Sequence, residues 1–135
     1  MDEQGKLVTL TLPWPPSVNS YWRRNGSRYF VSAKGIQYRK EVFFIAYDVR
    51  ANSIFPKHER ISVSIKAYPP DKRKRDLDNI LKSLLDSLQH AGVYDDDSQI
   101  DKLYIERYTP LNSQLIVTIN NCGYQGMSSS IIAGA

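Results

Sequence analysis

The sequence contains only one cysteine, Cys122, among its 135 residues. A single cysteine excludes an internal disulfide, a zinc site built from cysteines and a redox-active cysteine pair. No apolar run approaches the roughly 18 residues that a membrane-spanning helix requires, so a membrane protein is not expected. The first residues, MDEQGK, are polar and no long apolar segment follows them. We therefore expect no secretory signal and a cytoplasmic protein.

Charge and apolar content are those of an ordinary globular protein. Apolar residues make up 41% of the chain and charged residues 24%, which argues against wholesale disorder. The 18 basic and 14 acidic residues leave a net charge of +4, which favours an anionic partner without identifying it. The chain has no internal repeat and no long linker. We expect one domain over residues 1–135, ordered over about 7–121, with a flexible tail at 122–135.

Apolar periodicity predicts several strands, because successive side chains of a strand point to opposite faces. We expect strands at residues 7–12, 61–67, 103–108 and 114–120. Aromatic residues on both sides of Asn25-Gly26 predict a hairpin over residues 20–31, since Asn-Gly is a strong two-residue turn signal.

Two further segments have the character of helices. Residues 34–49 follow Ser32, which is a favourable N-cap. Its apolar residues include Ile36, Val42, Phe43, Ala46 and Tyr47. Residues 78–91 carry leucine and alanine at helical spacing, which predicts one buried stripe, and Gly92 is placed to end the helix. We therefore expect an α/β (α+β) fold in which a single layer of mixed β-sheet packs against two main helices.

The segment DKRKRDLDN, residues 71–79, places four cations directly before two carboxylates. Nucleic-acid phosphates would suit the cations, which are Lys72, Arg73, Lys74 and Arg75. A solvated loop or a localisation signal would have the same composition.

The two carboxylates, Asp76 and Asp78, stand at the predicted start of a helix. In an extended segment, side chains two residues apart point the same way, so the pair could meet at one point. Alternatively, each carboxylate could cap the helix, because aspartate is favoured at the N-cap and in the first turn.

Lys82 and a run of three acids complete the candidate site. Lys82 lies one helical turn after Asp78, where it could form a surface ion pair or serve a phosphate. The acids at 95–97 are either solvated surface or the source of a third ligand beside Asp76 and Asp78. Such an oxygen site would suit Mg²⁺ or Mn²⁺. Returning over the length of the helix is tight within one chain, so a third acid from a second copy is an open alternative.

A metal ion would reconcile the opposite charges of residues 71–79. The acids would hold the metal, and the metal would attract the anion that the neighbouring cations also favour. A metal and a lysine that stabilise in-line displacement at a phosphodiester form a recognised hydrolytic arrangement. These residues therefore favour a nuclease.

Four stretches of the chain share the motifs of one known family. They are LTLPWPPSVNSYWR, VSAKGIQYR, DKRKRDLDNILKSLLDSL and AGVYDDDSQI. Together they resemble the RusA family of Holliday-junction resolvases, in order and at similar spacing over roughly residues 7–120. The most specific part is the R-D-L-D-N-x-x-K core with its later acidic segment. The resemblance implies a small α/β homodimer with no membrane partner. It also implies a crossover junction endodeoxyribonuclease that makes paired symmetric incisions in four-way DNA junctions, with Mg²⁺ or with Mn²⁺ in its place.

The resemblance also assigns roles to particular residues. The catalytic, metal-binding carboxylates fall on Asp76, Asp78 and Asp97, and the essential lysine falls on Lys82. Asp97 is selected by the alignment before Ser98-Gln99, and Asp95 is the expected bystander. Contacts with the DNA backbone are expected from the basic run at 72–75.

Residues near the N-terminus are less specific candidates. Asn19, Tyr21 and Arg23 could contribute to the DNA surface, or they could simply pack in a turn and hairpin. Two symmetric cuts require two equivalent sites, which favours a dimer. The aromatic residues Trp22, Tyr29 and Phe30 suit either its interface or the core.

Two other functions remain open at this point. One is a junction-binding protein with weak or lost catalysis, and the other is a small protein whose basic loop docks on an acidic partner. Resolvases of this kind often belong to phages or prophages, and the sequence leaves the source open.

Overall fold

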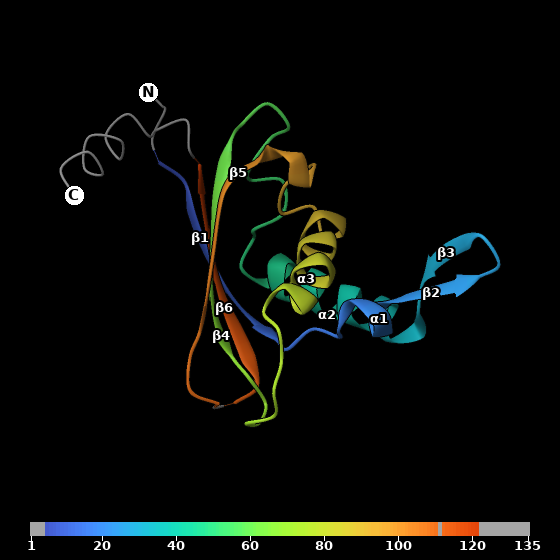
Figure 1. Ribbon diagram of the computed structural model, residues 1–135. Coiled ribbons are helices and arrows are strands. Elements are labelled where there is room, and N and C mark those ends of the chain that lie inside the picture. Colours follow the sequence, from blue (N-terminus) through green and yellow to red (C-terminus); the bar gives the residue numbers. More distant parts are fainter. Residues whose placement is uncertain (1–4, 111, 122–135) are drawn as a thin grey trace.

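The computed structural model describes residues 5–110 and 112–121, so the predicted tail at 122–135 lies outside the described residues. A four-stranded sheet in the order β1-β6-β4-β5 forms one layer of the molecule (Figure 1). Its strands are β1 (Leu7–Pro13), β4 (Ile61–Tyr68), β5 (Ile100–Arg107) and β6 (Gln114–Asn121). The β4–β5 pair is parallel and the other two pairs are antiparallel, which confirms the expected mixed sheet.

The alternation in the sequence sets which face of the sheet is buried. In β4, Ile61, Val63 and Ile65 are buried, while the residues between them are more exposed. β1 and β6 show the same alternation, so the apolar side chains of three strands meet on one face. The strands β5 and β6 follow each other in the chain but do not pair, because β4 lies between them in the sheet.

Helix α3 (Asp78–His90) connects the parallel strands β4 and β5 and covers the apolar face of the sheet. Of the leucines at the predicted helical spacing, Leu84 and Leu88 are fully buried, whereas Leu81 and Leu85 are only partly buried. Ile80, which the spacing did not include, is also buried. Gly92 follows the helix with a φ of 79°, a backbone conformation that glycine adopts without steric cost. The predicted end of this helix is therefore confirmed.

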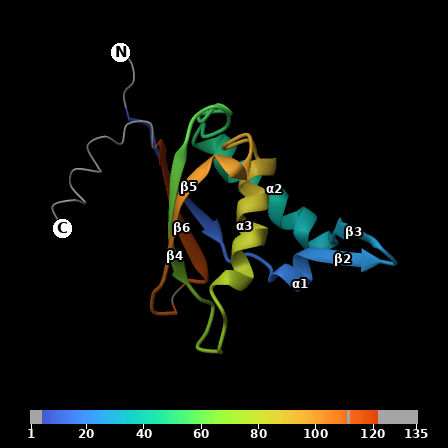
Figure 2. The same ribbon diagram turned by 45° about the horizontal axis from the view of Figure 1, so that its top comes forward.

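Helix α2 (Ala33–Asp48) lies on the same side of the sheet as α3 (Figures 1 and 2). The hydroxyl of Ser32 accepts a hydrogen bond from the Gly35 amide at 3.0 Å, which confirms the predicted N-cap. The buried residues of α2 are Gly35, Tyr38, Val42 and Ala46. Of the predicted apolar residues, Ile36, Phe43 and Tyr47 are 47%, 39% and 66% exposed. One helix stripe reaches the core, so these three side chains remain outside it.

Helix α1 (Val18–Tyr21) and the hairpin of β2 (Trp22–Asn25) and β3 (Arg28–Val31) project away from the main sheet (Figures 1 and 2). The hairpin is confirmed, but its two loop residues are Gly26 and Ser27 rather than Asn25 and Gly26. Gly26 has a φ of 67° at the first loop position, where glycine meets no steric penalty. Residue 20 belongs to α1, so the hairpin begins later than predicted. No helix within the described ranges is long and apolar enough to cross a membrane.

Candidate functional site

Asp71 organises the basic loop that precedes α3. Its carboxylate accepts a hydrogen bond from Arg75 Nη1 at 2.6 Å and one from the Arg73 backbone amide at 2.9 Å. These two contacts hold the pKa of the Asp71 carboxyl well below its usual range. The carbonyl of Arg75 also accepts a hydrogen bond from Arg107 Nη1 on β5 at 2.9 Å. Arg75 therefore stabilises the loop, in addition to any contact it makes with a ligand.

The other three cations of the loop stand at the surface. The Arg73 side chain is 80% exposed even though its Nε lies 3.3 Å from Asp71. Lys72 and Lys74 are exposed and form no ion pair with any carboxylate in the described part of the chain. Their charges are therefore available to an anion in solution.

Neither Asp76 nor Asp78 caps α3. The N-cap residue is Leu77, which makes no side-chain cap, and the carbonyl of Asp76 accepts the Asn79 amide at 3.2 Å. Leu77 has φ −62° and ψ −37°, so the extended geometry that would point both carboxylates one way does not hold at this residue. Within the described residues, neither carboxylate accepts a hydrogen bond. Both are exposed at the positive end of the helix dipole, where a further cation can reach them.

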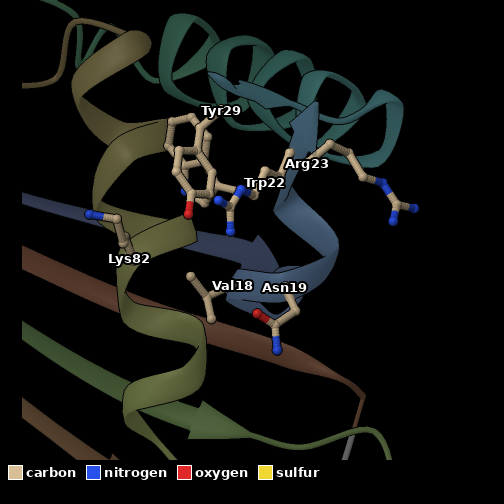
Figure 3. Close-up of a pocket in the computed structure, with 7 residues that line it drawn as sticks. Val18, Asn19, Trp22, Arg23, Tyr29 and Lys82 are labelled. Carbon is tan, nitrogen blue, oxygen red and sulfur yellow. The ribbon is translucent and has the colours of Figure 1, made fainter. Parts of the chain in front are cut away.

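Lys82 lies one turn further along α3 and does not pair with Asp78. No salt bridge within 4.0 Å joins these two residues in the part of the chain that the structure describes. The surface-pair interpretation of Lys82 is therefore not realised in this structure. Lys82 lines a hollow together with residues of the first helix and the hairpin (Figure 3).

Two hollows lie on either side of α1. Ser17 and Ser20 face the first, of about 690 Å³, together with cations of the basic loop and Asp76. Val18 and Asn19 face the second, of about 520 Å³, together with Lys82. The first hollow also contains Lys34, from the first turn of α2, which the sequence analysis did not place in the site. Only the packing of α2 beside α3 brings that cation to the basic loop.

Tyr21 joins α1, α2 and α3 and cannot contribute to a DNA surface. The residue is fully buried, and its hydroxyl donates to the carboxylate of Asp86 on α3. Arg39 of α2 donates to the same carboxylate at 2.7 Å and to the Tyr21 hydroxyl at 2.8 Å. Burial and the Asp86 carboxylate raise the pKa of Tyr21. A side chain at Gly35 would stand 2.8 Å from the Tyr21 carbonyl, which explains the glycine there.

The two other N-terminal candidates are exposed, as a DNA contact requires. Asn19 and Arg23 both line the second hollow. Figure 3 shows the Arg23 side chain directed outward, away from Trp22 and Tyr29. The hairpin thus presents the Arg23 cation to the surroundings of the molecule.

The acidic segment after α3 is folded around Gln99. Asp96 is the N-cap of a short 3₁₀ helix, η1 (Asp97–Gln99), and its carboxylate accepts the Ser98 amide at 3.3 Å. The carboxylates of Asp95 and Asp97 are left exposed, and the Asp97 amide donates to Gln89 Oε1 at 2.8 Å. Of the three acids, only Asp96 accepts a hydrogen bond through its carboxylate within the described residues.

One chain does not bring the three predicted metal ligands together. Asp97 contacts Gln89, eleven residues after Asp78 along α3, which corresponds to about 16 Å of helix. Ligands of one Mg²⁺ must each lie about 2.0–2.1 Å from the ion. In agreement, no group of three acidic, histidine or cysteine side chains that could hold a metal occurs among the described residues.

Comparison with known proteins places these residues in a family. Residues 13–120 match the family model of the endodeoxyribonuclease RusA. The chain belongs to the RusA family. The matched range contains α1, the hairpin, the basic loop, Lys82 and all three acids of the segment at 95–97.

Relatives of the chain carry the same family name. A crossover junction endodeoxyribonuclease of Enterobacteria phage HK97 is 52% identical over 96 residues, which cover 71% of this chain and 78% of the relative. The enzyme of that name from Escherichia coli K12 is 36% identical over 116 residues, with 85% and 95% of the two chains covered. The corresponding protein of Enterobacteria phage 82 is 36% identical over 117 residues, with 84% and 94% covered.

Gln99, at the end of the acidic motif of this RusA-family chain, has a structural role that the sequence analysis missed. It is only 1% exposed, and its Oε1 accepts the amides of Asp95 and Asp96 at 2.8 and 2.9 Å. Its Nε2 donates to three carbonyls of the segment at 55–59, at 2.9 to 3.4 Å. The side chain thereby ties the acidic segment to the connector before β4.

Replacement of Gln99 by leucine should lower the free energy of unfolding by roughly 2–4 kcal/mol, because buried amides and carbonyls lose their partners. Urea denaturation of both proteins measures the change. Gln37→Leu is the control, since Gln37 is exposed and makes a single 3.5 Å contact with Glu41. Equal losses in the two variants would show that the Gln99 network contributes little.

Proposed function

We propose that the chain is a metal-dependent endonuclease that resolves four-way DNA junctions by paired, symmetric phosphodiester incisions. One observation carries this proposal: two exposed carboxylates without a cap partner begin α3, one turn before an unpaired lysine and directly after a basic loop. Membership of the RusA family and the names of the relatives support the same activity.

The chemistry of the donor set fits a divalent metal. Asp76 and Asp78 offer the hard carboxylate oxygens that Mg²⁺ and Mn²⁺ prefer, with Asp97 as the third proposed ligand. A metal bound there would lower the pKa of an attacking water and polarise the phosphate. Lys82 would offset the negative charge that develops in the transition state.

The cations around the first hollow would hold the DNA backbone. Lys72, Arg73 and Lys74 present charge at the surface of the loop, and Lys34 faces the same hollow from α2. Such contacts add affinity and position the strand without reading its sequence. Arg75 would serve the same surface while holding the loop in shape.

We also propose that the active form is a homodimer in which each site combines Asp76 and Asp78 of one protomer with Asp97 of the other. The separation of about 16 Å along α3 within a chain supports this arrangement. Two equivalent sites are also what two symmetric incisions require. The exposed apolar residues of α2 provide surface that a second copy would cover. We propose that the protein acts in the cytoplasm, because its proposed substrate is recombining DNA.

The decisive experiment is incubation of the protein with a mobile synthetic four-way junction, with Mg²⁺ and with a chelator. We expect symmetric nicks in opposing strands with Mg²⁺ and none with the chelator. Tight binding without cleavage would favour a junction-binding protein that has lost catalysis. Absence of binding, or affinity that barely changes with salt concentration, would remove the role of the basic loop on DNA.

A further inference from the structure

The second hollow has aromatic walls and a cationic rim. It lies between α1, the hairpin and α3, and its volume of about 520 Å³ falls within the roughly 300–1,000 Å³ of typical ligand sites. Trp22 of β2 and Tyr29 of β3 line it together with Lys82 of α3. In Figure 3 the amine of Lys82 points away from the two rings. Neither Trp22 nor Tyr29 belongs to the hydrophobic core between the sheet and the helices.

Trp22 contributes a buried hydrogen-bond donor that has no acceptor. Among the described residues, its indole Nε1 is the buried side-chain nitrogen or oxygen atom that lacks a partner. An indole N–H can only donate, so the missing group is an acceptor oxygen or nitrogen. Buried polar groups are nearly always paired in folded proteins, and the residue that carries this unpaired donor lines the hollow.

Tyr29 and Arg24 provide a flat, cationic surface at the same place. The two residues are cross-strand partners, and the Arg24 guanidinium lies 5.6 Å from the centre of the Tyr29 ring. Tyr29 is 65% exposed, so its ring is accessible from solution. Aromatic rings and arginine planes are the groups on which proteins stack unpaired nucleobases.

Trp22 is held against α3 through its neighbour Tyr21. Tyr21 precedes Trp22 and packs edge-on against it, with ring centres 5.4 Å apart. The hydroxyl of Tyr21 is bound to Asp86, which lies one helical turn after Lys82. The position of Trp22 relative to Lys82 is therefore set by this buried contact and not by the exposed hairpin loop.

We infer that this hollow receives one unstacked nucleobase of the junction, from a nucleotide adjacent to the phosphate that Lys82 serves. The base would stack on Trp22 or Tyr29. Base pairs at a branch point stack less completely than those inside a duplex, so opening one of them costs less. This inference rests on the proposed function and adds to it how the branch point is held.

The test places 2-aminopurine, whose fluorescence rises on unstacking, at each nucleotide flanking the cleaved phosphates of a four-way junction. Binding is measured with a chelator, so that the strands remain intact. We expect a fluorescence rise at one position with the wild-type protein. Trp22→Ala should abolish the rise and weaken binding about 10-fold to 100-fold, the range found when a base-stacking aromatic is removed.

Two further variants keep the test decisive if Trp22→Ala folds poorly. Tyr29→Ala changes an exposed side chain and should also reduce the rise, whereas Tyr104→Ala removes an exposed tyrosine of β5, outside the hollow, and should not. Junction binding and cleavage by the wild-type protein without any rise would overturn the inference and leave the proposed function intact. Failure of the wild-type protein to bind or cleave the junction would overturn both.

Discussion

Asp76→Asn should slow junction cleavage at least about a hundredfold and leave junction binding close to that of the wild-type protein. The substitution keeps the size of the side chain and removes the charge that would hold the metal. Loss of metal-based stabilisation worth several kcal/mol corresponds to a rate about a hundredfold to a thousandfold lower. Because Asp76 does not cap α3, the thermal stability of the protein should not fall. Single-turnover cleavage, gel-shift affinity and thermal unfolding measure the three quantities.

Asp95→Asn is the matched control for Asp76→Asn. Asp95 is also an exposed carboxylate without a side-chain partner in the described structure, and it is the acid that we expect to be a bystander. Cleavage by Asp95→Asn should remain near the wild-type rate. A parallel loss of binding, stability and cleavage in Asp76→Asn would instead point to a structural role for Asp76.

Mixing Asp76→Asn with Asp97→Asn protein distinguishes a shared site from a site within one chain. In the shared arrangement, one site of each mixed dimer combines unchanged carboxylates from both protomers. Random mixing would then restore about a quarter of the wild-type nicking rate, because about half of the protomers enter mixed dimers with one intact site. A site built within one chain would leave the mixture as inactive as its components. The structure favours the first outcome, because α3 separates Asp78 from the Gln89 contact of Asp97.

Lys82→Ala should slow cleavage about a hundredfold to a thousandfold, the usual cost of removing one group that stabilises developing negative charge. Affinity for the junction should change much less, because the basic loop supplies most of the proposed backbone contacts. Cleavage under single-turnover conditions, compared with affinity over a series of salt concentrations, separates the two effects.

Lys102→Ala is the corresponding control, since Lys102 is exposed on β5, outside both hollows. Lys82→Arg tests whether charge alone is sufficient, because arginine keeps the charge in a planar group of different shape. An unchanged cleavage rate in Lys82→Ala would mean that this lysine is only part of the solvated surface of α3.

The elements that could be predicted are those whose signal is local. The alternation in β4 and the spacing of leucines in α3 depend on the side-chain periods of a strand and a helix, which any short window of sequence contains. Ser32 and Gly92 mark helix ends through contacts within a few residues. For α2 the period was right but the buried face was not fully predicted, because the neighbouring sheet and α3 decide which of several apolar stripes is covered.

The sequence by itself determined the strands, the main helices, the candidate residues around 71–82 and, through its motifs, the resemblance to the RusA family. Tertiary structure alone decided that Leu77 occupies the cap position, that Tyr21 is buried and that Trp22 stands beside Lys82. It also placed Asp97 at the far end of α3. The reason is physical: these outcomes depend on contacts between residues far apart in the chain, whose packing and hydrogen bonds no local pattern encodes.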